Sequence, residues 1–258
     1  MNRLLKKAAL IATAFCVSST ALAADVIRLG VDPTFPPYES IDAKGDMQGV
    51  DIDLGNAICA EMKVECKWVR INFDGAIPAL NARKIDAILS ALTITKERAK
   101  QVLFSTTLYN SPSRMMVDKS QDLDTTLEAV KGKTIGVAQG TSQAAYANKH
   151  WKGKGVNLVM YQNEEKSQQD LVLGRVDALL SDSAASLFFL ETPQGSKFHM
   201  SGSSVVDPEV FGNGVAMGLR LNDTELQTRI DTAINTLKKT GEYQKIIEKY
   251  KQYGLEPV

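Results

Sequence analysis

The sequence predicts an α/β protein with two lobes, each a mainly parallel sheet flanked by helices. Strand-like and helical patterns alternate along most of the chain, which is typical of parallel sheets covered by helices. One strand–helix pattern also occurs twice, in the first and in the second half. The length of 258 residues is sufficient for two domains of ordinary size.

The first 23 residues have the features of a secretory signal peptide. A basic start at 1–7 precedes an apolar or small-residue stretch at 8–22, and Ala21–Ala23 forms an A-x-A cleavage site. The stretch is shorter than the roughly 18–20 residues that a membrane anchor needs. Phe15 is too large for the position before a lipidated cysteine, so Cys16 does not indicate a lipoprotein. We therefore expect an exported, periplasmic product of 235 residues.

The charge balance excludes two classes of partner. The full chain has 30 Lys and Arg against 30 Asp and Glu, and without the expected signal 27 basic residues face 30 acidic ones. A nucleic-acid binder or a polybasic membrane-surface protein needs a net basic surface. We expect neither kind of partner.

Alternating patterns predict the elements of the first half. In chain order they are a strand at 26–31, a helix at 51–62, a strand at 67–71, a helix at 73–84, a buried strand at 85–92 and a helix from 95 to about 102. Ile52, Ile58 and Met62 have helical spacing, and Thr95 can cap the last helix.

The second half repeats this alternation. Strands are predicted at 134–138, 158–161 and 176–180, helices at 142–151, 164–173 and 184–190, and a mostly helical, lysine-rich stretch at 224–250. Those lysines are typical of a solvated helix face.

An internal repeat supports the two-lobed interpretation. Residues 84–90 (KIDAILS) match 175–181 (RVDALLS), and 29–34 matches 135–141. Chance combined with a shared strand–helix pattern is the alternative explanation. In open parallel sheets ligands bind beyond the carboxyl ends of the strands. Two such lobes facing each other therefore place both sets of strand ends on one cleft.

Cys59 and Cys66 are the cysteines outside the expected signal, and in an oxidising compartment they suggest a disulfide. Seven residues of continuous helix span about 10.5 Å, beyond the roughly 7 Å that a bridge tolerates between Cα atoms. The helix must therefore end near residues 62–63 and the chain must turn back. With His150 and His199 far apart, the sequence supplies too few ligands for a metal site, and we expect neither a metal nor a cofactor.

Polar residues follow several predicted strands, but no catalytic motif does. The sequence has no nucleophile elbow, no H-E-x-x-H motif and no phosphate-binding loop. Asp32, Arg98, Ser142 and Asp182 lie at or just beyond strand ends. Singly, each could be a cap or a surface residue. Together, an arginine and a helix N-terminus suit a carboxylate and an aspartate suits an ammonium, which is the complement of an α-amino acid.

Five strings resemble the periplasmic solute-binding proteins of ABC importers, in particular the lysine/arginine/ornithine- and histidine-binding group. They are DPTFPPYES, DIDLGNAIC, IDAILSALTITKER, GKTIGVAQGTSQ and FGNGVAMGLR, in the order of that family. The resemblance covers essentially all of the chain after residue 23. It implies the two-lobed fold with hinge closure, a basic L-amino acid ligand, a membrane permease as partner, and a monomer that is not an enzyme.

The resemblance also implies the ligand-contacting residues. They are Asp32, Phe35, Asp51, Phe73, Ser90, Ala91, Thr93, Arg98, Ala138, Thr141, Ser142, Gln143 and Asp182. Arg98 would hold the α-carboxylate with Thr93 and Ser142, and Asp182 would hold the α-ammonium. Phe35 and Phe73 would enclose the side-chain stem. Asp32, with Ser90 and Gln143 nearby and Asp51 behind, would meet a distal positive charge.

By the same resemblance the chain crosses between the lobes near 110–112 and near 205–207. Lobe 1 would then comprise 24–110 and 208–258, and lobe 2 would comprise 111–207 with the hinge crossings.

At two positions the sequence differs from the proteins that it resembles, and these differences leave the identity of the ligand open. Phe35 stands where Tyr is usual, and Ala91 where Ser is usual. An opine or another polar amino acid therefore remains an alternative ligand, and a sensor role remains an alternative to transport. An enzyme of this fold, similar to cyclohexadienyl or arogenate dehydratases, would need a further proton donor in the cleft.

Overall fold

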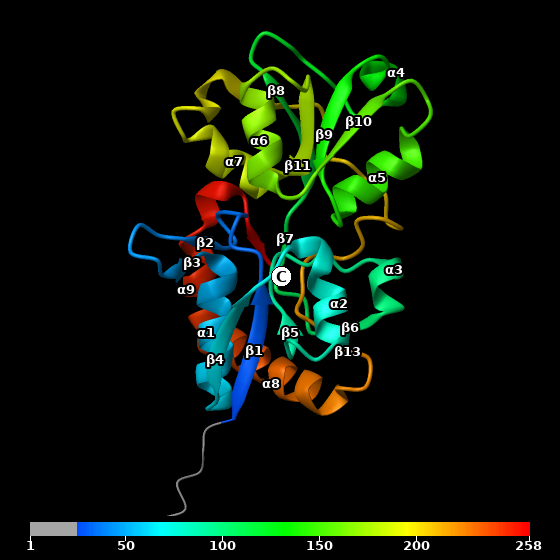
Figure 1. Cartoon of the computed structure of the whole chain (residues 1–258). Coiled ribbons are helices and arrows are strands. Elements are labelled where there is room, and N and C mark those ends of the chain that lie inside the picture. Colours follow the sequence, from blue (N-terminus) through cyan, green and yellow to red (C-terminus); the bar gives the residue numbers. More distant parts are fainter. Residues whose placement is uncertain (1–24) are drawn as a thin grey trace, which may run out of the picture.

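Two five-stranded sheets, each covered by helices, form the two lobes of the molecule (Figure 1). The computed structural model describes residues 25–258. The expected signal peptide at 1–23, with Cys16, lies outside this range. We call the lobe that contains β1 the first lobe, which is the lower one in Figure 1, and the other the second lobe.

The sheet of the first lobe has the spatial order β4-β1-β5-β13-β6. The strands are β1 (Val26–Val31), β4 (Glu65–Arg70), β5 (Ala87–Ile88), β6 (Val102–Phe104) and β13 (Gly218–Arg220). β1 runs parallel to β4 and β5, and β13 lies antiparallel between β5 and β6. All strands except β13 therefore share one direction, which confirms the predicted mainly parallel sheet.

The sheet of the second lobe has the same plan, in the order β10-β9-β11-β8-β12. The strands are β8 (Ser113–Asp118), β9 (Thr134–Ala138), β10 (Asn157–Tyr161), β11 (Ala178–Asp182) and β12 (Phe198–Ser201). Here β8 is the reversed strand, because it pairs antiparallel with both β11 and β12.

The sequence repeat corresponds to equivalent parts of the two sheets. β1 pairs with β5 through Leu29 and Ala87, and β9 pairs with β11 through Ile135 and Ala178. These two pairs are the matching positions of the repeated segments. The two lobes thus share their strand register as well as their topology, which chance similarity of pattern does not explain.

Helices cover both faces of each sheet. In the first lobe these are α1 (Val50–Met62), η1 (Phe73–Gly75), α2 (Ala76–Asn81), α3 (Lys96–Ala99), α8 (Thr224–Thr240), α9 (Glu242–Glu248) and η3 (Lys251–Tyr253). Leu29 belongs to the core under α1 and α8, whereas Ile88 belongs to the core under α2. The two cores lie on opposite faces of the sheet, because successive side chains of a strand point to opposite faces.

The second lobe is covered in the same way by α4 (Leu127–Val130), α5 (Ser142–His150), α6 (Glu164–Val172), α7 (Ser183–Leu190) and η2 (Gly195–Lys197). Val137 and the fully buried Trp151 belong to the core on the α5 side. Leu171 and Phe189 belong to the core on the side of α6 and α7.

Three predicted elements are shorter than expected. The helix predicted at 73–84 is divided into η1 and α2 and ends before Arg83, which is left-handed (φ 58°). The strand predicted at 85–92 pairs only over β5, because the chain leaves the sheet at Ser90 and turns at Ala91 (φ 46°). The helix predicted to reach residue 102 is α3 alone, and Val102 begins β6.

The chain passes between the two sheets twice. It leaves β6, continues through β7 (Tyr109–Asn110) and enters β8, and it returns from β12 through residues 202–217 to β13. β7 pairs with β14 (Glu256–Pro257), so the C-terminus lies beside the first crossing (Figure 1). A short hairpin of β2 (Ser40–Ile41) and β3 (Met47–Gln48) precedes α1.

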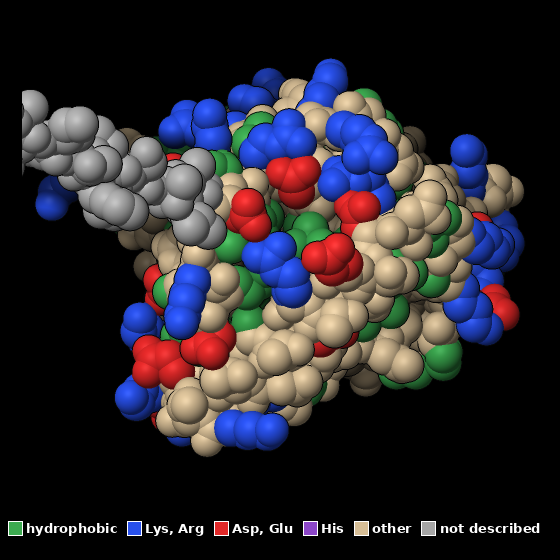
Figure 2. All heavy atoms as spheres, turned by 90° about the horizontal axis from the view of Figure 1, so that it is seen from below, with side chains coloured by type: hydrophobic (Ala, Val, Ile, Leu, Met, Phe, Trp, Pro, Cys, Tyr) green, Lys and Arg blue, Asp and Glu red, His purple; other side chains and the backbone are tan. Residues whose placement is uncertain are grey.

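The lower end of the first lobe carries basic and acidic side chains intermixed (Figure 2). Arg28 pairs with Asp86 at 2.8 Å, and Arg220 contacts Asp86 at 3.4 Å and Asp223 at 2.7 Å. These ion pairs compensate the charges of Arg28, Arg220, Asp86 and Asp223 locally.

Neither a membrane span nor a metal site is found within 25–258. No helix of that range is long and apolar enough to cross a membrane. Nor does the range contain a group of three or more His, Cys, Asp or Glu side chains that could hold a metal ion. His150 instead contacts Asp207 at 2.7 Å, and His199 contacts the carbonyl of Gln121 at 2.8 Å.

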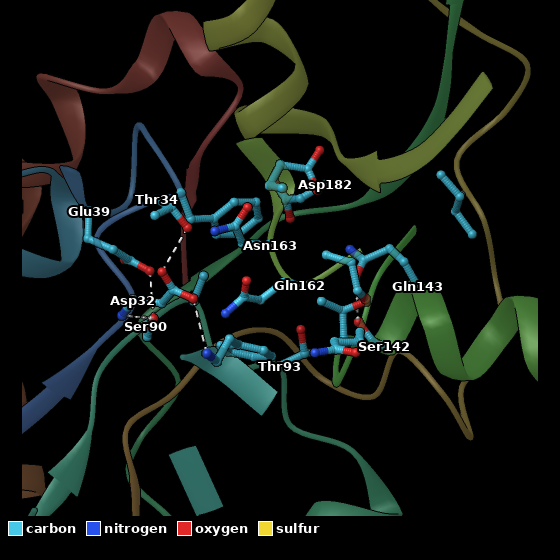
Figure 3. Close-up of a pocket in the computed structure, with 18 of the residues that line it drawn as sticks. Asp32, Thr34, Glu39, Ser90, Thr93, Ser142, Gln143, Gln162, Asn163 and Asp182 are labelled. Carbon is cyan, nitrogen blue, oxygen red and sulfur yellow. Dashed lines mark hydrogen bonds between the residues drawn. The ribbon is translucent and has the colours of Figure 1, made fainter. Parts of the chain in front are cut away.

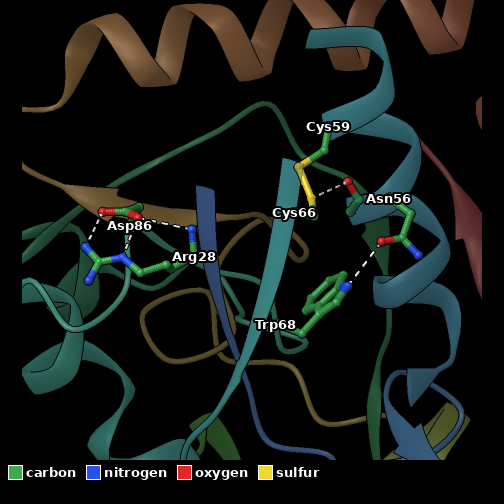
Figure 4. The surroundings of a disulfide bond; sticks show 7 residues. Arg28, Asn56, Cys59, Cys66, Trp68 and Asp86 are labelled. Carbon is green, nitrogen blue, oxygen red and sulfur yellow. Dashed lines mark hydrogen bonds and ion pairs between the residues drawn. A yellow bond between two sulfur atoms is a disulfide. The ribbon is translucent and has the colours of Figure 1, made fainter. Parts of the chain in front are cut away.

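Cys59 and Cys66 form the expected disulfide, with their Cα atoms 5.9 Å apart (Figure 4). As predicted, α1 ends at Met62 and the chain turns back at Lys63, which is left-handed (φ 56°). The bridge joins the end of α1 to the start of β4, far from the strand ends that face the second lobe.

Replacing both cysteines by serine is expected to lower the free energy of unfolding by about 2–3 kcal/mol, because the bridge restricts the unfolded chain. Ligand affinity should stay within about twofold, since the bridge does not touch the cleft. Denaturant unfolding and calorimetry on the same preparation check both statements. An affinity loss larger than tenfold would show that the bridge shapes the cleft.

Candidate ligand-binding cleft

A cavity lies between the two lobes, and its atom-free space, open solvent included, is about 610 Å³. We call it the cleft (Figure 3). It is lined by Asp32, Thr34, Phe35, Glu39, Phe73, Ser90, Ala91, Thr93, Arg98, Ala138, Gln139, Thr141, Ser142, Gln143, Gln162, Asn163, Glu164, Leu180 and Asp182. Every predicted ligand-contacting residue except Asp51 belongs to this lining.

Arg98 is a buried cation that contributes to the cleft from the first lobe. The Thr95 side chain caps α3 by accepting the N–H of Arg98 at 3.1 Å, as the sequence predicts. The guanidinium donates to the carbonyls of Thr93 (2.7 Å) and of Gly140 in the second lobe (3.0 Å). Burial lowers the pKa of Arg98 to about 10. None of the ion pairs within 25–258 includes it, so its charge is available to an anionic ligand group.

Two aromatic rings of the first lobe, those of Phe35 and Phe73, line the cleft. The Arg98 guanidinium lies over the Phe73 ring, 5.3 Å from its centroid. Phe35 packs against Tyr38 with centroids 5.1 Å apart. Phe35 and Phe73 both line the cleft and provide apolar surface for an aliphatic stem.

Asp182 is a buried carboxyl that contributes to the same cleft from the second lobe. Its Oδ1 accepts hydrogen bonds from the hydroxyls of Tyr38 (2.5 Å) and Ser111 (2.8 Å) and from the N–H of Ala184 (2.9 Å), which caps α7. No hydrogen bond from residues 25–258 reaches Oδ2. Burial raises the pKa of Asp182. Arg98 and Asp182 thus belong to one cavity, on opposite lobes.

Asp32 is held rigidly at the end of β1. Its carboxylate accepts the hydroxyl of Thr34 at 2.7 Å and the N–H of Phe73 at 3.0 Å. Its own N–H donates to Ser90 Oγ at 3.1 Å, which joins the ends of β1 and β5 (Figure 3). These bonds fix the position of the Asp32 carboxylate.

Asp51 lies behind the wall of the cleft and is not one of the residues that line it. It is completely buried in α1, where its carboxylate accepts the N–H of Ala91 and the hydroxyl of Tyr109, both at 2.6 Å. It therefore fixes the left-handed turn at Ala91. Burial raises the pKa of Asp51 to about 6.

Glu39 is a buried lining residue that the sequence analysis missed. Its Oε1 accepts the Ser90 hydroxyl at 2.6 Å, and its Oε2 is buried without a partner in the described structure. Burial, and then the negative charge of Asp51, raise the pKa of Glu39 well above its usual range.

The second lobe presents the N-terminus of α5 to the cleft. The Thr141 hydroxyl caps the helix by accepting the N–H of Ala144 at 3.0 Å, and Ser142 and Gln143 are buried in the first turn. The Gln143 amide donates to Ser113 Oγ at 2.8 Å. A helix N-terminus favours negative charge, so this end of the cleft suits a carboxylate.

The other missed lining residues are Thr34, Gln139, Gln162, Asn163, Glu164 and Leu180. Gln162, Asn163 and Glu164 directly follow β10. The rule that ligands lie beyond the carboxyl ends of parallel strands could have found them, because β10 is one of the predicted strands.

Direct contacts also join the lobes around the cleft. The Gln139 amide donates to Asp74 at 2.8 Å, and Gly140 lies so close to Asp74 that an added Cβ would come within 2.8 Å of its Cα. Together with the bonds of Arg98 to Gly140 and of Tyr38 to Asp182, these contacts join the two lobes beside the cavity.

Comparisons with known proteins give consistent results. Residues 27–253 match the family model for bacterial extracellular solute-binding proteins, family 3. The lysine/arginine/ornithine-binding periplasmic protein of Escherichia coli K12 is 44% identical over 95% of each chain, and its histidine-binding periplasmic protein is 41% identical over 92% of each.

Solved structures agree with the sequence comparison. An ancestral arginine-binding protein bound to arginine superposes with a TM-score of 0.81 at 34% identity, covering 87% of this chain and 97% of the other. A Salmonella typhimurium periplasmic binding protein, described as having high arginine specificity, superposes with a TM-score of 0.81 at 29% identity, covering 88% and 99%. The chain therefore belongs to family 3 of the bacterial extracellular solute-binding proteins.

Proposed function

We propose that the protein captures a basic L-amino acid in the cleft and delivers it to the membrane permease of an ABC transporter. The observation that carries this proposal is the charge arrangement of the cleft. An unpaired guanidinium, Arg98, belongs to one lobe, and a carboxyl with a free oxygen, Asp182, belongs to the other. This arrangement is complementary to the carboxylate and ammonium of one amino acid.

The excess of acidic groups supports a cationic side chain. Among residues 25–258, four carboxyls and one guanidinium line the cleft, those of Asp32, Glu39, Glu164 and Asp182 and that of Arg98. Burial raises the pKa of Glu39, Glu164 and Asp182, so Asp32 is the carboxyl of this set that best serves a cation in the empty protein. A cation removed from water needs an opposite charge nearby, and Asp32 supplies one at the end of β1. The relatives are periplasmic proteins named for binding lysine, arginine, ornithine or histidine, which supports the same class of ligand.

Within this proposal the residues have separate roles. Arg98, Thr93 and the N-terminus of α5 hold the α-carboxylate. Asp182 holds the α-ammonium, and Phe35 and Phe73 enclose the stem. The walls of the cleft are completed by Ser90, Ala91, Ala138, Thr141 and Gln143. The first lobe comprises residues 24–110 and 208–258, and the second lobe comprises residues 111–207 with the hinge crossings. The protein acts as a monomer in the periplasm after cleavage at residue 23.

Calorimetric titration of the purified mature protein with arginine, lysine, ornithine, histidine and glutamine tests the proposal. At least one of the cationic amino acids is expected to bind with a dissociation constant at or below about 1 μM, or −8.2 kcal/mol, and glutamine more weakly. Absence of binding by all four basic amino acids at micromolar concentrations would contradict the ligand assignment.

One observation favours a second function, a dehydratase of the same fold. Glu164 lines the cleft with a pKa of about 7 and could donate a proton, which such an enzyme requires. Incubation with arogenate and prephenate decides between the two, since a binding protein turns over neither.

A further inference from the structure

Glu164 is a buried carboxyl that lines the cleft but has no role in the arrangement proposed above. It is the first residue of α6 and is 7% exposed. Its Oε1 accepts the hydroxyl of Ser181 at 2.6 Å. Ser181 belongs to β11 and directly precedes Asp182, so the Glu164 carboxyl reaches the strand end that carries the candidate ammonium partner.

The first lobe contains a matching pair. Ser90 and Ser181 are equivalent positions of the sequence repeat, and each donates its hydroxyl to a buried glutamate at 2.6 Å, Ser90 to Glu39 and Ser181 to Glu164. The two glutamates differ in their neighbours. For Glu39 the neighbouring charge that raises the pKa is that of the buried Asp51. For Glu164 it is that of Asp182, which lines the cleft.

No cation compensates Glu164 in the structure of residues 25–258. No Lys, Arg or His of that range forms an ion pair with it. β9 contributes no titratable side chain, β11 contributes Asp182, and the hydroxyl of Tyr161 on β10 is bound to Asp170. Across the cleft lie Asp32, Glu39 and Arg98.

These surroundings favour the neutral form of the carboxyl. Burial, and then the negative charge of Asp182, raise the pKa of Glu164 to about 7, although the Ser181 hydrogen bond lowers it. On its own helix, Gln168 also lowers the pKa, and Glu165 is exposed.

We propose that Glu164 is a second ammonium-recognising carboxyl of the cleft, partly protonated in the empty protein and ionised when the ligand ammonium binds beside Asp182. This inference rests on the proposed function. The incoming positive charge favours the carboxylate form, so the proton leaves Glu164 for a buffer base and the carboxylate shares the ammonium with Asp182.

The consequence is a proton-linked affinity. Because the pKa is about 7 in the empty protein and falls in the complex, capture of the ligand at pH 7 releases about half a proton. The affinity for arginine is therefore expected to rise about tenfold from pH 6 to pH 8. Arginine is the suitable probe, because its guanidinium and its ammonium both stay protonated over this range.

Calorimetry of the mature protein with L-arginine, in buffers that differ in ionisation enthalpy, measures the number of protons released. The wild type is expected to release about half a proton at pH 7 and more at pH 6. Glu164→Gln should abolish the release and flatten the pH dependence of affinity. Glu165→Gln, a matched change of the exposed neighbour on α6, should behave as the wild type does.

Two outcomes would overturn the proposal: no proton release by the wild type at pH 6 to 7, or the same release from Glu164→Gln as from the wild type. Absence of release from the wild type overturns the proposal even if the glutamine variant fails to fold. If arginine does not bind at all and no other basic amino acid binds either, the proposed function fails. If arginine binds without Glu164-dependent release, only the present inference fails.

Discussion

Replacing Arg98 by alanine is expected to weaken strongly the binding of every amino acid, whether its side chain is cationic or neutral. Among residues 25–258 the guanidinium is the only cation that lines the cleft, and without it the ligand α-carboxylate would be left buried without a partner. Removing one member of a buried ion pair costs about 3–5 kcal/mol, which corresponds to a loss of roughly 150- to 5,000-fold. Calorimetry with arginine and with glutamine measures this loss.

Arg175→Ala is the matched control for Arg98→Ala. Its guanidinium pairs with Asp170 on the surface of the second lobe and its side chain is 66% exposed, so affinity should not change. If Arg98→Ala kept arginine and glutamine affinities within threefold of the wild type, Arg98 would not hold the carboxylate. Thermal unfolding of both variants excludes a folding defect as the cause.

Asp32→Asn is expected to weaken cationic ligands selectively. Asparagine keeps an oxygen for the hydroxyl of Thr34 or the N–H of Phe73 but removes the negative charge at the end of β1. A hydrogen bond to a charged group contributes about 1.5–3 kcal/mol, so arginine affinity should fall about 10- to 150-fold. Glutamine affinity should stay within about threefold, because glutamine has no charge at that end.

Asp122→Asn, whose side chain is 93% exposed on the second lobe, serves as the control for Asp32→Asn and should leave both affinities unchanged. If Asp32→Asn lowered the affinities for arginine and glutamine equally, Asp32 would maintain the structure of its loop and would not recognise the ligand side chain.

Local sequence patterns predicted the elements whose structure depends mainly on residues that are close together in the sequence. β1, β9 and the capped starts of α3 and α5 lie where propensity and capping placed them. The reversed strands β8 and β13 were missed. Each follows a crossing between lobes, so no regular strand–helix alternation precedes it in the sequence.

The cleft was predicted less completely than the fold. Strand-end positions such as Asp32, Arg98 and Asp182 were found because parallel topology brings them together. Whether a carboxyl lines a cavity or lies behind its wall depends on packing between distant segments. Asp51 is buried against Ala91 and Tyr109, and Glu164 reaches Ser181 from another strand. No local pattern carries that information.

The crystal structure of the mature protein with bound L-arginine is the most direct test of a zwitterion held between the lobes. The α-carboxylate is predicted within hydrogen-bonding distance of the Arg98 guanidinium, and the α-ammonium beside Oδ2 of Asp182. The ligand guanidinium is predicted at Asp32. Arginine bound outside the cleft, or with its backbone groups contacting neither Arg98 nor Asp182, would contradict the account.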